Sequence, residues 1–144
     1  SLINEQKFIK KGEKKIILKE AGWKICPMIC YDLRFPAFSR NQEDYDMLIY
    51  LANWPIKRIE AWNTLLKARS IENQCYTIGV NRIGEDGNGI TFNGNSCAFD
   101  AFGNKIEMVL KSKEVLKITL SYDKLELNRR QMNFLQDRDK FTIL

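Results

Sequence analysis

The residues with the most distinctive chemistry lie in one short segment, KICPMICYDLRFPAFSRN, at positions 24–41. An apolar run ends at Cys30 and is followed by a mixed turn that contains Asp32 and Arg34. A cysteine thiolate is a nucleophile, and a sharp strand-to-helix turn can expose it beside backbone N–H groups that stabilise a negatively charged oxygen. The N–H of Tyr31 is the nearest such donor in the sequence. From these residues alone, Cys30 is either a nucleophile presented by a turn or a core thiol at the end of a strand.

The chain contains no histidine, and this restricts the possible chemistry. Ser-His-Asp and Cys-His catalysis cannot form within these residues. If Cys30 is a nucleophile, its base must be a carboxylate, a lysine or a group supplied from elsewhere.

The cysteines favour reduced thiols over a disulfide framework or a metal site. They stand at positions 26, 30, 75 and 97, and the first two form a C-x3-C motif without a second pair at metal spacing. Zinc sites favour other spacings, so we expect no metal. Widely separated cysteines in a chain of this size indicate a cytoplasmic protein.

Composition predicts one globular domain. The chain has 144 residues, of which 44% are hydrophobic and 28% charged, and no apolar run is long enough to span a membrane. The first residues, SLINEQKFIKKGEKK, are polar and basic and do not resemble a signal peptide. The net charge of +5 comes largely from lysines near this end, without interleaved aromatic residues, so we expect no nucleic-acid partner.

The hydrophobic pattern predicts a mixed α/β layered fold in one unit, residues 1–144, without repeats or linkers. The segment MLIYLA at 47–52 is expected to be a strand buried on both faces. The segment RIGEDGNGITFNGN at 82–95 is interpreted as a long loop. Strands are predicted over 14–20, 23–29, 47–52, 76–81, 96–99, 106–110 and 115–120, and helices around 37–41, over 56–74 and from about 121.

Several motifs, in order, resemble the nitrilase or carbon–nitrogen hydrolase superfamily over essentially the whole chain. MICYDLRFPAFSRN resembles the cysteine motif of that family. The segment from YDMLIYLANW to GEDGNG, residues 45–89, is similar to the one that follows the nucleophile in the omega-amidase branch. NSCAFDAFGNKI resembles the next hairpin, and RRQMNFLQDRDKF the closing tail.

The resemblance implies an α-β-β-α sandwich, with this chain as its C-terminal portion. It also implies that Cys30 attacks an amide carbonyl, that ammonia leaves, and that water hydrolyses the thioester. A glutamate would act as base and acid, and a lysine with a backbone N–H would stabilise the oxyanion. The implied substrates are monoamides of dicarboxylic acids, such as 2-oxoglutaramate, and the resemblance implies no organic cofactor. The alternative is a non-catalytic nitrilase-like scaffold or binding protein.

One departure from the family pattern concerns the groups that activate the thiol. In the family the first glutamate and the lysine precede the cysteine, the lysine in a Lys-x-His-Leu-Phe-like stretch that this sequence lacks. We therefore expect residues 1–144 to be the C-terminal part of a single longer domain, inactive by itself; a natural short form is the alternative. Glu5 falls where the second glutamate of the family would be, or it is an exposed loop carboxylate.

The substrate-binding candidates surround Cys30 in the sequence or match family pocket positions. They are Tyr31 with its N–H, Arg34, Asn53 and Trp54. Arg34 could bind a substrate carboxylate, or it could form a structural ion pair with Asp32 or Glu72. Asn53 and Trp54 match pocket-lining positions, or form only a turn before a helix.

The remaining expectations concern support and assembly. We predict that Arg69, Glu72 and Asn73 form a buried polar network behind the site. Asn95 stands where relatives often carry aspartate, so a charge role there is in doubt. The partners implied by the resemblance are a small-molecule amide, the missing N-terminal part of the same chain, and a second copy in a homodimer or higher homo-oligomer, with the tail at 134–144 crossing to that copy.

Overall fold

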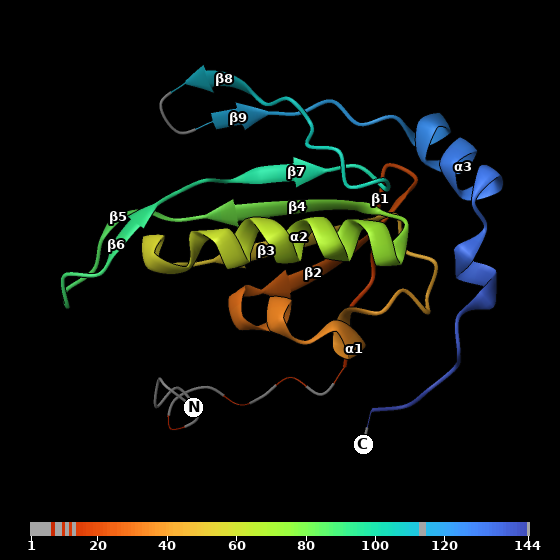
Figure 1. Cartoon of the computed structure of the whole chain (residues 1–144), viewed down its shortest axis with the longest axis horizontal. Helices are drawn as coiled ribbons and strands as arrows, with labels where there is room; N and C mark the ends of the chain where they lie inside the picture. Colours follow the sequence, from red (N-terminus) through yellow and green to blue (C-terminus); the bar gives the residue numbers. More distant parts are fainter. Residues whose placement is uncertain (1–6, 8–9, 11, 13, 113–114, 144) are drawn as a thin grey trace.

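A five-stranded sheet forms the centre of the molecule in the computed structural model, which describes all residues except 1–6, 8–9, 11, 13, 113–114 and 144 (Figure 1). The strand order is β1-β2-β3-β4-β7. The three central strands, β2 (Trp23–Ile29), β3 (Met47–Ala52) and β4 (Tyr76–Asn81), are parallel. The edge strands, β1 (Leu18–Glu20) and β7 (Cys97–Phe99), pair in antiparallel fashion. The carboxyl ends of β2, β3 and β4 therefore meet at one edge of the sheet.

Helices and two hairpins surround this sheet. Helix α2 (Ile59–Asn73) runs across one face and is preceded by the 3-10 turn η3 (Ile56–Arg58) (Figure 1). The 3-10 turn η2 (Cys30–Arg34) and helix α1 (Pro36–Ser39) connect β2 to β3. The other elements are hairpin β5 (Ile83–Glu85) with β6 (Thr91–Asn93), hairpin β8 (Val109–Ser112) with β9 (Val115–Lys117), helix α3 (Tyr122–Gln131) and the 3-10 turn η4 (Phe134–Asp137).

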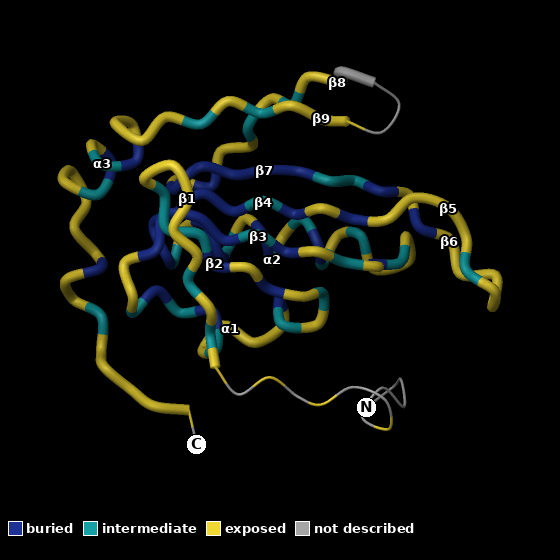
Figure 2. The backbone as a smooth tube through the Cα atoms, turned by 180° about the vertical axis from the view of Figure 1, so that it is seen from behind, coloured by how far each residue is buried: buried dark blue, intermediate teal, exposed yellow. Residues whose placement is uncertain are grey.

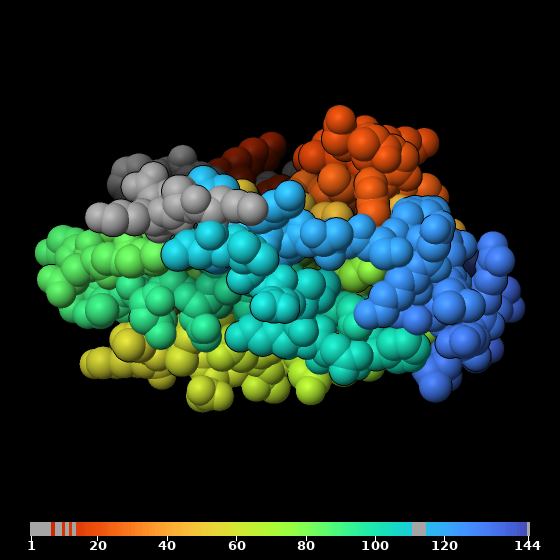
Figure 3. Space-filling view, turned by 90° about the horizontal axis from the view of Figure 1, so that it is seen from above, coloured from red at the N-terminus to blue at the C-terminus, as the bar shows by residue number. Residues whose placement is uncertain are grey.

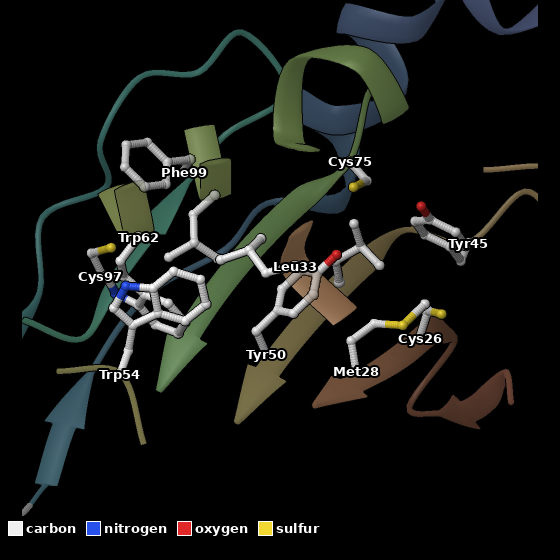
Figure 4. Packing of buried hydrophobic residues seen from close by; sticks show 12 residues of the cluster. Cys26, Met28, Leu33, Tyr45, Tyr50, Trp54, Trp62, Cys75, Cys97 and Phe99 are labelled. Carbon is white, nitrogen blue, oxygen red and sulfur yellow. The ribbon is translucent and has the colours of Figure 1, made fainter. Parts of the chain in front are cut away.

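The main core lies between the sheet and α2 (Figure 4). Alternate residues of each strand point to this face, as the two-residue period of a strand requires. Gly79 allows the close approach of the helix, because a Cβ at this position would lie 2.4 Å from Leu66 Cδ1 and 2.5 Å from Trp62 Cζ2. The fully or nearly fully buried members of this cluster include Cys26, Met28, Leu48, Tyr50, Trp62, Leu66, Cys75 and Cys97.

The opposite face of the sheet is only partly covered by the described residues. The strand registers place Ile29, Leu51 and Val80 side by side, and these side chains are 68%, 53% and 45% exposed. Figure 2 views the molecule from this side, and Figure 3 shows α2, in yellow and yellow-green, along the other side of the strands. The prediction that 47–52 is buried on both faces is therefore met on the α2 face, whereas on the other face Met47 is buried in a second core cluster and Leu51 is exposed.

The C-terminal segment packs where the parallel strands begin, at the opposite end of the sheet from Cys30 (Figure 1). Arg129 donates hydrogen bonds to Asp46 Oδ1 (2.8 Å), to the Tyr45 carbonyl (2.7 Å) and to the Gln74 carbonyl (2.9 Å). The side chain of Gln74 in turn accepts a hydrogen bond from the N–H of Leu135, a buried residue of η4. The buried ion pair of Arg129 with Asp46 therefore connects α3 to the start of β3.

A second, more exposed ion pair lies further along the tail. Arg138 contacts Asp44 at 2.8 Å, and the two side chains are 21% and 62% exposed, against 15% and 4% for Arg129 and Asp46. The tail thus packs on its own chain as far as residue 138.

The turn after β7 is organised by Asp100. Its Oδ1 accepts hydrogen bonds from the N–H groups of Phe102 and Asn104, both at 3.0 Å, and its Oδ2 accepts one from Lys124 Nζ at 3.1 Å. Burial favours the neutral acid, but these hydrogen bonds outweigh it and hold the pKa of Asp100 below its usual value. Asp100 therefore connects the edge of the sheet to α3.

The central elements agree with the sequence predictions. The strands at 23–29, 47–52 and 76–81 have the predicted boundaries, and the predicted helix at 56–74 begins as η3 and continues as α2. Helix α3 begins after Ser121, whose hydroxyl accepts a hydrogen bond from the Lys124 N–H at 3.2 Å. These segments have strong local signals in their apolar runs, their helical spacing and their capping residue.

The peripheral elements differ more. The segment 82–95 is not a loop but contains hairpin β5–β6, because Asp86 Oδ1 accepts hydrogen bonds from the N–H groups of Asn88 and Ile90 and closes the turn. The strand predicted at 14–20 is reduced to Leu18–Glu20. The strand predicted at 106–110 lies instead at Val109–Ser112, where it pairs with β9, and Lys105 and Ile106 make only isolated contacts with β7.

Candidate active site

The candidate active site is the edge of the sheet where the three parallel strands end. Cys30 follows β2 directly and is the first residue of η2. Its φ is +37°, in the left-handed region that residues with a side chain rarely adopt. The carboxylate of Asp32 accepts a hydrogen bond from the Ile29 N–H at 3.0 Å and closes the turn around the thiol. The predicted sharp turn at Cys30 is therefore present.

Helix α2 holds this turn from the core side. Arg69, which is only 4% exposed, donates from Nη2 to the Leu33 carbonyl at 2.6 Å and from Nη1 to Glu72 Oε1 at 3.0 Å. The side chain of Asn73 binds elsewhere and accepts a hydrogen bond from the Asn41 N–H. Of the predicted polar network, Arg69 and Glu72 therefore support η2, whereas Asn73 stabilises the connection to β3.

Burial separates the other three cysteines from Cys30. Desolvation raises the pKa of the Cys26 and Cys75 thiols to about 12 and that of Cys97 to about 11. They therefore stay protonated at neutral pH, as expected for core thiols, and none of the four cysteines forms a disulfide. Cys30 is the half-buried member of the set and lies against the border of the core.

Arg34 does not form the ion pair that was considered for it. Its guanidinium carbon lies 4.9 Å from the centroid of the Trp54 ring. Asp32 instead binds a backbone N–H, and Glu72 pairs with Arg69. None of the ion pairs between described residues includes Arg34. Arg34 is exposed, and its guanidinium is therefore accessible from its position over the aromatic ring.

Trp54 is held on all sides, whereas its neighbour Asn53 has an exposed side chain. The indole N–H of Trp54 donates to the Arg58 carbonyl at 2.7 Å, and its ring lies 5.5 Å from that of Trp62. Its backbone N–H donates to Asn81 Oδ1 at 2.7 Å. Figure 4 shows Trp54 and Trp62 together at one end of the core. Trp54 is therefore part of the core, and only Arg34 lies over it.

The other predicted site residues occupy less definite positions. Tyr31 has a side chain that is 60% exposed and lies edge-on against Phe35, with 5.2 Å between the ring centroids. Its N–H belongs to the first turn of η2, where backbone donors lack acceptors within the helix. Asn95 donates to Asn63 Oδ1 at 3.1 Å. Glu5 lies outside the described residues.

The sequence interpretation did not identify Asn81, although its side chain connects two segments at the carboxyl end of the parallel strands. It is the last residue of β4 and is 7% exposed. Since the carboxyl ends of parallel strands meet at one edge of a sheet, a polar residue at the end of a predicted strand was the available signal. Hairpin β5–β6 leaves the sheet at this same edge, directly after Asn81 (Figure 1).

Two surface cavities lie away from Cys30. One, of about 410 Å³, lies beside hairpin β8–β9 and is lined by Ile106, Glu107, Val109, Lys117 and Thr119. The other, of about 690 Å³, lies beside the C-terminal segment and includes Arg129, Leu135 and Arg138. Within the described residues, no group of three or more acidic or cysteine side chains could hold a metal ion. No helix of the described part is long and apolar enough to cross a membrane.

Comparison with known sequences gives consistent matches. The profile of the family described as carbon–nitrogen hydrolase matches residues 2–130. An omega-amidase YafV of Yersinia enterocolitica is 44% identical over 135 residues, which cover 92% of this chain and 52% of that protein. A 2-oxoglutaramate amidase of Bacillus subtilis is 34% identical over 104 residues, which cover 71% of this chain and 40% of that protein. The chain spans about half the length of the curated relatives that it matches.

A solved structure agrees with the sequence matches. The protein XC1258 of Xanthomonas campestris, described as a CN-hydrolase superfamily protein with an arsenic adduct in the active site, superposes with a TM-score of 0.89 at 36% identity. The match covers 98% of this chain and 56% of that one. The mixed α/β fold described above is therefore shared by both chains.

Proposed function

Because this chain belongs to the carbon–nitrogen hydrolase family, we propose that it carries the nucleophile of an amidohydrolase that cleaves a linear carboxamide to an acid and ammonia. In this reaction the thiolate of Cys30 attacks the carbonyl carbon and forms a tetrahedral oxyanion. The C–N bond then breaks, ammonia leaves with the proton supplied by a general acid, and a thioester remains. Water attacks the thioester carbonyl, and the acid and the thiol are released.

The observation that carries this proposal is the left-handed turn at Cys30. A thiol at φ +37°, at the carboxyl end of a parallel strand, is held at the mouth of the sheet rather than in the core. The Tyr31 N–H, in the first turn of η2, is the proposed backbone donor to the oxyanion. The family members with amidase names lend support, since the chain is 44% identical to one omega-amidase over 135 residues.

The general base, general acid and oxyanion lysine are proposed to come from residues outside the described structure. Glu5 is our candidate for the second glutamate. The first glutamate and the lysine would lie in a preceding part of the same domain, of which residues 1–144 would be the C-terminal part. The exposed row of Ile29, Leu51 and Val80 supports this, because an apolar sheet face gains stability when another layer covers it.

The proposed substrates are monoamides of dicarboxylic acids, such as 2-oxoglutaramate. Arg34 would bind the free carboxylate, because a guanidinium that forms no ion pair with a described carboxylate can bind one from the substrate in a bidentate way. Asn53, whose side chain is exposed, would line the substrate pocket beside it, and the buried Trp54 would support the pocket from beneath Arg34. The relatives named 2-oxoglutaramate amidase and omega-amidase motivate this class of substrate.

We further propose a cytoplasmic protein that forms a homodimer or a higher homo-oligomer. The reduced cysteines support the location. Exposed apolar residues of the C-terminal segment, Phe134, Phe141 and Ile143, support contact with a second copy.

The decisive experiment measures ammonia release from succinamate by the complete protein. Cys30→Ala should reduce turnover to background, whereas Cys97→Ala, which changes a buried core thiol, should keep it. Retained turnover in Cys30→Ala would contradict the assignment of the nucleophile. The 144-residue segment purified alone should be inactive, and turnover by it would show that no further catalytic groups are needed.

A further inference from the structure

We propose that Asn81 is a positioning residue for the carboxylate-binding subsite, acting on Arg34 through the indole ring of Trp54. This role rests on the proposed function, since it concerns the binding of the substrate carboxylate. Asn81 is not itself in contact with Arg34 in any hydrogen bond or ion pair of the described structure. It acts on the backbone that carries the ring.

After β3 ends, the side chain of Asn81 makes the hydrogen bonds to the Trp54 backbone that a neighbouring strand would otherwise make. The ladder between β3 and β4 ends at the pair Ala52 and Asn81. Beyond it, Asn81 Oδ1 accepts from the Trp54 N–H at 2.7 Å, and Nδ2 donates to the Trp54 carbonyl at 3.0 Å. Both backbone groups of one residue are thus bound by a single buried amide, which fixes the path of the chain after β3.

The same amide connects a second loop to this point. Asn81 Nδ2 also donates to the Gly94 carbonyl at 2.6 Å, and the Asn81 N–H donates to Ser96 Oγ at 3.0 Å. The segment that returns from hairpin β5–β6 is therefore held against the segment that carries Trp54. All the hydrogen-bonding groups of the amide are used except one Oδ1 lone pair. No isosteric apolar side chain can reproduce these contacts.

The ring of Trp54 transmits this position to Arg34. The ring cannot rotate freely, because its N–H binds the Arg58 carbonyl and it packs at a tilt of 43° against the Trp62 ring. The guanidinium of Arg34 lies over the ring, with 4.9 Å between its central carbon and the centroid. Contact with the ring restricts the position of the guanidinium, and its exposed donors remain available to a carboxylate. The position of the Trp54 ring therefore determines the position of the guanidinium donors of Arg34.

Removing any buried amide is expected to lower stability, so a matched control must separate this general effect from an effect on carboxylate binding. The chain contains such a control. Asn41 is fully buried, and its side chain donates to the Tyr45 and Asn73 carbonyls and accepts from the Tyr45 N–H. These contacts resemble those of Asn81 in number and kind, but they lie at the opposite edge of the sheet, before β3. Asn41→Ala should therefore cost stability without changing the carboxylate subsite.

The test compares two amides in the complete protein. Succinamate carries a carboxylate where butyramide carries a methyl group, so the ratio of their kcat/KM values measures carboxylate recognition. Arg34→Met and Asn81→Ala should each lower this ratio by roughly tenfold or more, mainly through KM, because a charged hydrogen bond is weakened. Asn41→Ala should leave the ratio within about twofold of the wild type, as expected for a site with no shared contacts.

A second measurement is independent of turnover. Hydrogen exchange of the Trp54 backbone N–H should be faster in Asn81→Ala than in the wild type and unchanged in Asn41→Ala, after correction for global stability. Unchanged exchange in Asn81→Ala would overturn the positioning role even if no amide is cleaved. An unchanged substrate ratio in Asn81→Ala alone would also overturn it. An unchanged ratio in Arg34→Met would instead remove the carboxylate role from the proposed function, and this role of Asn81 with it.

Discussion

The backbone conformation of Cys30 should destabilise the fold, and a glycine at the same position should relieve this strain. A residue with a Cβ in the left-handed region carries about 1–2 kcal/mol of strain, and glycine carries none. Glycine also has a more flexible unfolded state, which costs about 0.5–1 kcal/mol relative to alanine. Since φ at Cys30 is +37°, Cys30→Gly should be more stable than Cys30→Ala by about 0.75 kcal/mol, the difference between the midpoints of these two costs.

The comparison of glycine with alanine isolates the backbone, because both variants lack the sulfur atom. Urea unfolding followed by tryptophan fluorescence measures the free energy of unfolding of each variant. Ala21→Gly is the matched control, since Ala21 also has a positive φ, +46°, in an exposed turn without a proposed role. It should gain stability by a similar amount. Both Cys30 variants should release no ammonia in the complete protein, whereas Ala21→Gly should keep full turnover.

Two results would refute this reasoning. If Cys30→Gly is less stable than Cys30→Ala while Ala21→Gly is stabilised, the turn at Cys30 is not strained. If neither glycine variant is stabilised, positive φ values in this fold do not carry the expected cost. A gain at both positions would indicate that the protein retains a strained turn at the site where the thiol is presented.

Three further predictions concern the surrounding fold. Gly79→Ala should lower the free energy of unfolding by about 1–3 kcal/mol, because the new methyl group would overlap side chains of α2. Gly87→Ala, with open space around its Cβ, should change it by no more than about 0.5 kcal/mol in the same urea titration. Arg129→Met should lower the free energy of unfolding by about 3–5 kcal/mol, since it leaves the buried carboxylate of Asp46 without its ion-pair partner. Arg138→Met, at the more exposed pair with Asp44, should lower it by at most about 1 kcal/mol. Equal losses in the two variants would contradict the role of burial. Because the pKa of Asp100 is lowered in the fold, its ionised form stabilises the protein above the unfolded pKa of about 3.9, and this contribution is lost as the pH falls through the lower folded value. Asp100→Asn should therefore be less stable than the wild type at pH 7, and the gap should shrink below about pH 4; a gap that is independent of pH would contradict this role.

Much of the central fold could be predicted from local patterns. The strand that ends at Ile29 and the strand at 47–52 are continuous apolar runs, each followed at once by a polar or turn-forming segment. The helix of 59–73 has apolar residues at helical spacing. Such signals depend on the chain over a few residues, so they survive without knowledge of the neighbours. The hairpin at 83–93 was missed because its strands have only three residues each and its turn depends on the carboxylate of Asp86.

The candidate site was predictable only in part, for the same reason. The turn at Cys30 is a local event that the sequence predicts, but the local residues leave open whether the thiol is a nucleophile or a core residue, and the resemblance of several motifs to one family favours the nucleophile. The partner of Arg34 was not local. The sequence offers Asp32 and Glu72, which have complementary charge, but both are already engaged by nearer groups in the folded chain.

By itself the sequence determined that a reactive residue type stands at a strand end, that catalysis by histidine is excluded within these 144 residues, and that the motifs resemble one family. Only the tertiary structure decided that Arg34 lies on Trp54 and that Asn81 holds Trp54 in place. These contacts join segments 20 and 27 residues apart in the sequence, and they form only because parallel strands bring their carboxyl ends to one edge. Strand register and the packing of α2 set that geometry, and no local pattern encodes either of them.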